Sequence, residues 1–406
     1  MKKILKLILI VFLLPLNAQH NKQDIAITDS LSIELSDISK QGRINGFSVA
    51  IVNKDGVLYN QGFGFSDIKT KSKYTKNTIQ NIGSISKTFI GLALMKAQEQ
   101  GMLKLDDPIN QYLPFKIINP YFPNQPITIR HLATHTSSIK DSKKYWKNSY
   151  ILKEDITDSK VKVPSYFLPK DKKISMHDFF KNCLVKNEKW YSKKAFFKNK
   201  PGEFFEYSNM AAALAAFIIE KATGKDFMSY TNEVIFEPLK MTNTGWSFDA
   251  INFSLHSKLY HKPQVELAFY NLVTYPDGGL KTSSNDLSKY LLELIKGCSG
   301  NGTLLKKESY KELFTKQLSG QNYKERNAKS KYNDEYNIGI FMGFSAKGYI
   351  GHTGGDPGIA AFMFFNENSK LGKILIINTE LDKESLGEFK DIWNKLDEYE
   401  TKITYD

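Results

Sequence analysis

A serine and a lysine stand three residues apart in the sequence Gly83-Ser84-Ile85-Ser86-Lys87-Thr88. Residues at this spacing share a helix face, so the Lys87 amine is expected to reach the Ser84 hydroxyl and accept its proton. A serine cap followed by a lysine that extends to water would show the same spacing by chance. The pair is therefore a candidate nucleophile and base that needs support from elsewhere in the chain.

The helix that carries this pair is predicted over residues 84–100 and ends at Gly101, a residue suited to the left-handed conformation that closes many helices. Its middle, residues 89–95, is apolar all round, which indicates a buried helix. Burial destabilises an ammonium group, so the pKa of Lys87 is expected to fall below its usual value of about 10.4.

Two β-hairpins are predicted near the two ends of the chain. Residues 47–52 and 57–59 flank an Asp-Gly turn, and residues 360–365 and 373–378 flank the polar stretch 366–369. These patterns predict an α/β fold of the α+β type. One antiparallel sheet is built from N- and C-terminal strands and flanked by helices, with a mostly helical lobe inserted into it.

The helical lobe is expected to hold helices at 129–135, at 209–223 closed by Gly224, and at 285–295 capped by Ser284 or Asn285. A final helix is predicted over 383–399. Residues 139–200 are rich in charged and polar side chains, which indicates long loops and short helices at the surface. Whether this segment forms a lid over a site stays open at this point.

The first residues are typical of a secretory signal peptide. Three lysines precede the apolar run 7–14, and small and polar residues follow at 17–19. We therefore expect a signal peptide at 1–18 and an exported, periplasmic or extracellular protein. Its single catalytic domain would span 19–400, with an α/β lobe at about 25–82 and 335–400 and a helical lobe at about 83–334.

The formal charge of +13 makes the chain basic, so weak association with an anionic envelope surface is one expectation. The lysines are scattered and no nucleic-acid motif is present, so no nucleic-acid partner is predicted. Cys183 and Cys298 are the two cysteines, and their spacing leaves both a disulfide and two free thiols open. The oligomeric state is likewise open.

Two further motifs follow the serine and lysine along the chain. In Tyr207-Ser208-Asn209, a phenol and a carboxamide at a helix start can point into a cleft. In His352-Thr353-Gly354-Gly355, expected at the end of a strand at 348–351, the glycines let backbone N–H groups approach a ligand.

Neither a metal nor a cofactor is predicted. His131 and His135 stand four residues apart and in principle share a metal ion, but position 132 is Leu, so the HEXXH pattern fails.

With these three motifs in this order, the chain resembles the penicillin-recognising serine hydrolases, which include serine β-lactamases, D,D-peptidases and related esterases. The tyrosine in the second motif, Tyr207, and the histidine at the head of the third, His352, resemble the class C-like branch of this family. That branch also includes D-aminopeptidases and esterases. The resemblance runs from about residue 44 to 379 and includes the supporting stretches 62–65, 129–138, 201–204 and 278–287. It implies a fold of the β-lactamase/transpeptidase type.

The resemblance implies a role for each motif. Ser84 would be the acylated nucleophile, Lys87 its proton acceptor or the residue that tunes that acceptor, and Tyr207 the proton shuttle to the leaving group. Because coupled groups titrate together, the sequence leaves open whether Lys87 or Tyr207 is the base. Asn209 would hold Lys87 and the substrate amide.

The third motif would bind substrate. His352, Thr353 and Gly354 lie on the strand that docks a substrate carboxylate or carbonyl, and the N–H groups of Ser84 and Gly355 would form the oxyanion hole. Losing one such donor costs on the order of 3 kcal/mol of transition-state stabilisation.

These roles imply an exported serine hydrolase that acts through an acyl-enzyme on Ser84. Its substrate would be a small molecule or a peptidoglycan-derived peptide or ester, of the D,D-peptide or β-lactam type. His352 replaces the lysine that grips a β-lactam carboxylate, which favours ester, amide or peptide substrates. The alternatives are a carboxylesterase of the same fold and a non-catalytic binding or sensing module of the envelope.

Overall fold

The computed structural model describes residues 14–324 and 335–403. Most of the predicted signal peptide, residues 1–13, lies outside the described residues, and residues 14–18 begin helix α1 (Leu14–Ser39). Within the described part of the chain, no helix combines the length and hydropathy that crossing a bilayer requires.

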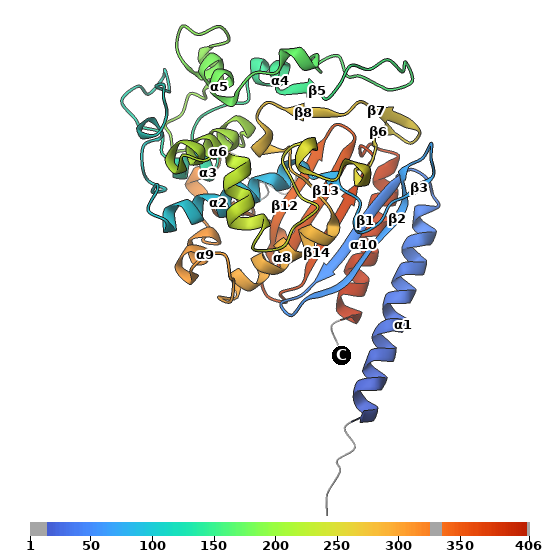
Figure 1. Cartoon of the computed structure of the whole chain (residues 1–406). Helices are drawn as coiled ribbons and strands as arrows, with labels where there is room; N and C mark the ends of the chain where they lie inside the picture. The colour runs from blue at the N-terminus through green and yellow to red at the C-terminus, as the bar shows by residue number, and fades with distance from the viewer. Residues whose placement is uncertain (1–13, 325–334, 404–406) are drawn as a thin grey trace, which may run out of the picture.

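An eight-stranded antiparallel sheet forms the centre of the fold (Figure 1), in the order β10-β11-β12-β13-β14-β1-β2-β3. Strand β1 pairs with β14, with Phe47 opposite Ile377, so strands from the two ends of the chain lie side by side. This pairing confirms the prediction of a sheet built from both ends. The strands are β1 (Gly46–Val52), β2 (Val57–Asp67), β3 (Ser72–Lys73), β10 (Asn337–Ile338), β11 (Gly343–Phe344), β12 (Tyr349–Asp356), β13 (Ile359–Asn366) and β14 (Gly372–Ile377).

Both predicted hairpins are confirmed, as β1–β2 and β13–β14. The first turn is stabilised by the Asn53 side chain, whose oxygen accepts hydrogen bonds from the N–H groups of Asp55 and Gly56, both at 2.9 Å. Such a side-chain bond to the following backbone is what suits Asn to tight turns.

Helices cover both faces of the sheet, which is why strand β1 is apolar at nearly every position. Phe47, Val49 and Ile51 face a cluster formed with α1 and α10 (Ser385–Lys402), whereas Ala50 and Val52 face the main core. Alternate residues of a strand point to opposite faces, so burial on both sides requires a continuous apolar run. Helix α8 (Ser284–Cys298) packs against β1 and β14 from the main-core side.

The predicted helices are present, with one corrected cap. Helix α2 spans Ser86–Glu99 after a 3-10 turn at Gly83–Ile85, and Gly101 has the expected positive φ of 71°. Helix α6 spans Asn209–Thr223 and ends at Gly224, with φ 70°.

The cap of α8 is Ser283, whose side chain accepts the Asp286 N–H, and not Ser284 or Asn285. Ser284 already has its own partner, because its hydroxyl donates to Asn60.

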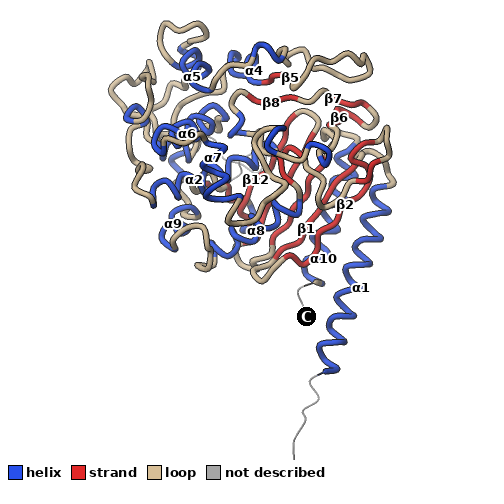
Figure 2. The backbone as a smooth tube through the Cα atoms, viewed as in Figure 1, coloured by secondary structure: helices blue, strands red, loops and turns tan. Residues whose placement is uncertain are grey.

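Most of the remaining elements lie on the side of α2 and α6, whereas residues 259–267 lie beside the main sheet (Figure 2). They are α3 (Ile129–Ala133), α4 (Lys143–Ser149), α5 (Met176–Leu184), α7 (Phe227–Thr231) and α9 (Lys307–Leu313), with the small sheets β4 (Gln80–Asn81) with β9 (Lys281–Thr282), β5 (Tyr150–Leu152) with β8 (Tyr270–Leu272), and β6 (Leu259–Lys262) with β7 (Val265–Leu267). Residues 139–200 form α4, β5, α5 and intervening loops, as expected. Cys183 and Cys298 are free thiols.

Candidate active site

The turn that carries Ser84 lies directly against strand β12. A side chain at Gly83, which has φ 52°, would place its Cβ 2.9 Å from the Gly355 nitrogen, and a Cβ at Gly354 would lie 1.9 Å from the Ile82 carbonyl oxygen. Only glycine fits at these two positions without a backbone shift. The glycines therefore bring the start of α2 and the third motif into contact.

Lys87 is fully buried beneath Ser84, with none of its surface exposed. Its Nζ donates to the Ser84 Oγ at 2.9 Å and to the Asp277 carbonyl oxygen at 2.5 Å. This geometry excludes the alternative in which the lysine extends to water. Desolvation lowers the pKa of Lys87 to about 8, although the nearby carboxylates of Asp277, Asp141 and Asp356 oppose the shift.

Tyr207 lies beside this pair. The Lys87 Nζ is 5.3 Å from the centre of its ring, and the centre of the His135 ring lies 4.4 Å from it, with the two rings tilted by 36°. Burial raises the pKa of Tyr207 well above its usual range, and a hydrogen bond with Ser84 only partly offsets this. The phenol is therefore protonated at neutral pH.

Asn209 begins helix α6 and has a partner that the resemblance did not imply. Its Nδ2 donates to Asp141 at 2.8 Å, whereas the hydrogen bonds of Lys87 go to Ser84 and Asp277. The expectation that Asn209 holds Lys87 is thus not what the structure shows. The second partner of Lys87 is the backbone carbonyl of Asp277, which comes from another segment.

The third motif lies inside strand β12 and not at its end. Residues 352–356 continue to pair with β13, with His352 opposite Met363 and Gly355 opposite Ala360. The predicted end of the strand at Gly351 is therefore wrong. Glycines are poor strand formers by propensity, and here the β13 partner strand holds them in the ladder.

A single cleft brings the predicted residues together. It has a volume of about 1280 Å³ and is lined by Ser84, Tyr207, Asn209, His352, Thr353, Gly354 and Gly355. Lys87 lies below its floor. Residues from three distant parts of the chain thus meet around the Ser84 hydroxyl.

One wall of the cleft comes from the segment 139–200. Lys143, Trp146 and Lys147 on α4 line it, together with Tyr150 and Tyr166. Trp146 is 45% exposed and Tyr166 is 44% exposed, so two large aromatic side chains are available to a ligand at this wall.

Three acids at or beneath the cleft were not predicted from the sequence. Asp141 holds Asn209, Asp277 accepts a hydrogen bond from the Tyr145 hydroxyl at 2.7 Å, and Asp356 accepts one from the Tyr150 hydroxyl at 2.7 Å. Burial raises the pKa of Asp277 and raises that of Asp356 to about 6. Asp356 directly follows the third motif, which was an available signal, whereas nothing local in the sequence distinguishes the other two.

The two histidines four residues apart serve different elements. His131 caps helix α3, where its Nδ1 accepts the Thr128 N–H at 3.2 Å, and His135 accepts the Ser208 N–H at 3.3 Å. In the described ranges, no group of three or more His, Cys, Asp or Glu side chains is placed to hold a metal ion.

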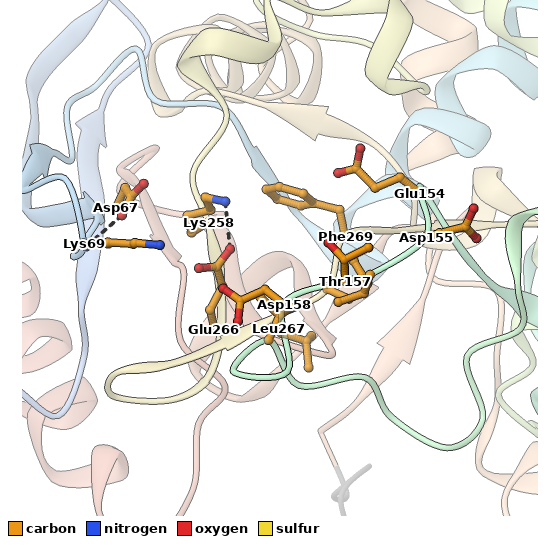
Figure 3. Close-up of a pocket in the computed structure, with 13 residues that line it drawn as sticks. Asp67, Lys69, Glu154, Asp155, Thr157, Asp158, Lys258, Glu266, Leu267 and Phe269 are labelled. Atoms are coloured by element: carbon orange, nitrogen blue, oxygen red, sulfur yellow. Dashed lines mark hydrogen bonds and ion pairs between the residues drawn. The ribbon is translucent and has the colours of Figure 1, made fainter.

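A second, smaller pocket of about 400 Å³ shares no residue with the cleft. Figure 3 shows its polar lining, with Glu154 and Asp155 on one side of the view, Asp67 and Lys69 on the other, and Asp158 near the Lys258–Glu266 ion pair (2.7 Å) between them. The nucleophile and base of the first motif lie elsewhere.

Comparison with known proteins gives relatives of one kind. Protein flp of Staphylococcus aureus (strain NCTC 8325 / PS 47) is 30% identical over 259 residues, which cover 62% of this chain and 46% of that protein. This chain therefore spans about half the length of that relative. Penicillin-binding protein 4* of Bacillus subtilis (strain 168) is 25% identical over 377 residues, which cover 86% of this chain and 71% of that protein.

A solved structure shows the same fold. The D-amino acid amidase from Ochrobactrum anthropi SV3 superposes with a TM-score of 0.65 at 18% identity, and the match covers 92% of this chain and 99% of that chain. The family model described as Beta-lactamase matches residues 33–393. The resemblance seen in the three motifs is confirmed, and the chain belongs to the beta-lactamase family.

Proposed function

We propose that the protein is an exported serine hydrolase that forms an acyl-enzyme on Ser84 and hydrolyses amide or ester bonds. One observation carries the proposal, namely the 2.9 Å hydrogen bond between the buried Lys87 amine and the Ser84 hydroxyl at the wall of an open cleft. A serine becomes nucleophilic when a base within hydrogen-bond reach removes its proton.

The charge states support Lys87 as that base. Desolvation lowers its pKa, so a neutral amine is accessible near neutral pH, whereas burial keeps Tyr207 protonated. In acylation, Ser84 Oγ attacks the substrate carbonyl carbon and its proton passes to Lys87. Tyr207 then gives its proton to the leaving group and recovers one from the Lys87 ammonium.

Deacylation would follow the same route with water as the nucleophile. Water loses a proton to Lys87, its oxygen bonds to the acyl carbon, and Ser84 leaves with a proton restored to Oγ. The developing oxyanion would be bound by the N–H groups of Ser84 and Gly355, which the contact between Gly83 and β12 brings close together.

We infer a small-molecule or peptidoglycan-derived peptide or ester as the substrate. The name D-amino acid amidase points to D-amino-acid amides, and the name penicillin-binding protein 4* points to penicillins. A carboxylesterase is the second candidate, because His352 stands where a lysine would give a permanent positive charge for a carboxylate.

Labelling of the nucleophile tests the proposal. Intact-mass spectrometry after exposure to a fluorophosphonate or a penicillin should show one adduct on the wild type and none on Ser84→Ala. Ser86→Ala is the matched control, because Ser86 lies in the same segment and its hydroxyl accepts the Leu280 N–H. No adduct on the wild type with either reagent, or equal labelling of Ser84→Ala, would refute the acyl-enzyme.

A substrate panel separates the candidates. Turnover of D-phenylalanine amide or of a D-alanyl-D-alanine peptide would support an amide or peptide hydrolase. Turnover of p-nitrophenyl butyrate, with no hydrolysis of nitrocefin or of the peptide, would support a carboxylesterase. Stable acylation with no turnover of any substrate would instead indicate a non-catalytic binding or sensing module.

We extend the proposal to location on the basis of the basic and apolar start of the chain. Cell fractionation followed by N-terminal sequencing should find a periplasmic or extracellular protein that begins near Gln19. An intact N-terminus in the cytoplasm would refute export. Binding to vesicles with and without anionic lipid tests the expected weak association with an anionic envelope surface.

A further inference from the structure

The carboxylate of Asp141 binds the start of helix α6 through four hydrogen bonds. Its Oδ1 accepts from the Ser208 hydroxyl at 3.0 Å and from the Met210 N–H at 2.9 Å. Its Oδ2 accepts from the Asn209 backbone N–H at 3.0 Å and from the Asn209 Nδ2 at 2.8 Å. Both oxygens are thus occupied by donors from the tyrosine motif.

This arrangement fixes which way the Asn209 amide faces. A carboxylate only accepts hydrogen bonds, so the NH₂ group of Asn209 must point to Asp141. Its oxygen is then left for the cleft that Asn209 lines. Asp141 thereby decides that Asn209 offers a substrate an acceptor and not a donor.

The segment that ends at Asp141 also holds the residues on either side of Tyr207. The His135 carbonyl oxygen accepts the Glu206 N–H at 2.7 Å, and the His135 Nδ1 accepts the Ser208 N–H at 3.3 Å. Hydrogen bonds therefore hold the backbone on both sides of Tyr207, and Asp141 holds the first residues of helix α6 that follow.

Asp141 also bears on the charge of Lys87. The groups that face Lys87 are Asp277 from the turn before β9, Asp356 from β12, His135 and Asp141 from the loop after α3, and Tyr207. The three carboxylates all favour the ammonium form of Lys87 and oppose its desolvation. Removing one of these negative charges favours the neutral amine.

We propose that Asp141 is a positioning residue of this site, which holds the Tyr207–Asn209 segment against the Ser84–Lys87 pair and orients the Asn209 carboxamide in the cleft. The inference rests on the proposed acyl-enzyme function. It assigns a role to a residue outside the three motifs.

Asp141→Asn is the informative variant, because it keeps the shape and replaces one accepting oxygen by an NH₂ group that faces N–H donors. We expect kcat/KM for a p-nitrophenyl ester to fall by ~10- to 100-fold, the scale of a misplaced catalytic group. The acid limb of its pH profile should move to lower pH, because Lys87 loses a neighbouring negative charge.

Two further variants separate the effects of the charge and the position of the Asp141 carboxylate from an effect on the stability of helix α6. Asp141→Glu keeps the charge but displaces the carboxylate, so it should lower kcat/KM and leave the acid limb where the wild type has it. Ser208→Ala removes the α6 cap bond to Ala211 and one bond to Asp141. It leaves the charge of Asp141 and its other three hydrogen bonds, so kcat/KM should fall less than in Asp141→Asn and the acid limb should stay close to wild type.

These measurements separate failure of the proposed function from failure of the role of Asp141. If the wild type neither hydrolyses the ester nor reacts with a fluorophosphonate, the proposed function and this inference fall together. If the wild type is active but Asp141→Asn keeps the wild-type pH profile and loses no more activity than Ser208→Ala, only the role of Asp141 is refuted. Should Asp141→Asn fail to give the wild-type circular dichroism spectrum, Asp141→Glu decides, and a loss no greater than that of Ser208→Ala overturns the role.

Discussion

At the scale of single residues, the environment of Lys87 determines the chemistry. An exposed lysine is an ammonium at neutral pH and cannot accept a proton. Lys87 is fully buried and bound to the Ser84 hydroxyl, so its neutral form becomes accessible. The pKa of Tyr207 is shifted in the opposite sense, so in the proposed mechanism Lys87 acts as the base and Tyr207 as the acid.

The pH dependence of activity follows from this shift. Lys87 must be neutral to accept the Ser84 proton, so kcat/KM should rise with pH and level off above its pKa of about 8. Lys87→Arg keeps the charge at every accessible pH and should lower kcat/KM by ~10²- to 10⁴-fold, the usual contribution of a general base.

Lys96→Met is the control for this measurement. Lys96 lies on the same helix and also donates to a backbone carbonyl, that of Leu304, but it lies outside the lining of the cleft. Its profile should match that of the wild type. A flat wild-type profile between pH 5 and 9 would contradict Lys87 as the base.

At the scale of elements, α4 gives the cleft a basic wall. Lys143 and Lys147 are one turn apart and both line the cleft, and within the described ranges neither forms a salt bridge with a carboxylate. The lining also contains two acids, of which Asp356 accepts a hydrogen bond from the Tyr150 hydroxyl and Glu380 is hydrogen-bonded to His261. We therefore expect the two lysines to favour acyl donors that carry a negative charge.

The double variant Lys143→Gln, Lys147→Gln tests this wall. For a p-nitrophenyl ester with a free carboxylate, kcat/KM should fall by about 10-fold at low salt, because steering of a charged ligand is lost. The matched neutral ester should be hardly affected. Lys144→Gln, an exposed lysine of α4 outside the cleft lining, should change neither, and an equal effect of both variants would contradict a specific role.

At the scale of the whole molecule, the last helix, α10, is attached to the central sheet by ion pairs. The Lys373 side chain on β14 is fully buried and forms ion pairs with Asp397 and Glu400 on α10. Helix α10 in turn packs beside α1 over the face that the terminal strands share (Figure 1). This contact ties the two ends of the chain together on the side of the sheet away from α8.

Lys373→Ala should destabilise the protein without touching the cleft. Breaking a buried pair leaves partner charges uncompensated, so the free energy of unfolding should fall by about 3 kcal/mol, seen as a lower midpoint of denaturation. Lys395→Ala removes ion pairs between more exposed side chains and should cost less than about 1 kcal/mol. An equal decrease in the free energy of unfolding for the two variants would contradict the role of Lys373 in holding α10 against the sheet.

Much of the fold could be predicted from the sequence, because the chemistry of neighbouring residues constrains it. The turn at residues 53–56, closed by the Asn53 side chain, the apolar run of β1 and the glycine that ends α6 each depend on neighbouring residues. The strand through His352-Thr353-Gly354-Gly355 was predicted too short, because its pairing with β13 is a contact with another segment. The cap at Ser283 was missed by one position, since several adjacent polar residues can cap a helix.

The sequence by itself determined the family, the three motifs and the apolar pattern of the terminal strands, because these depend on residue types at short spacings. Only the tertiary structure decided what surrounds the Ser84–Lys87 pair. Asp141, Asp277 and Asp356 reach it from separate loops and a strand, and the burial of Lys87 arises from packing over the whole core. Such long-range contacts set the charge of Lys87 and the orientation of Asn209, and no local pattern in the chain encodes them.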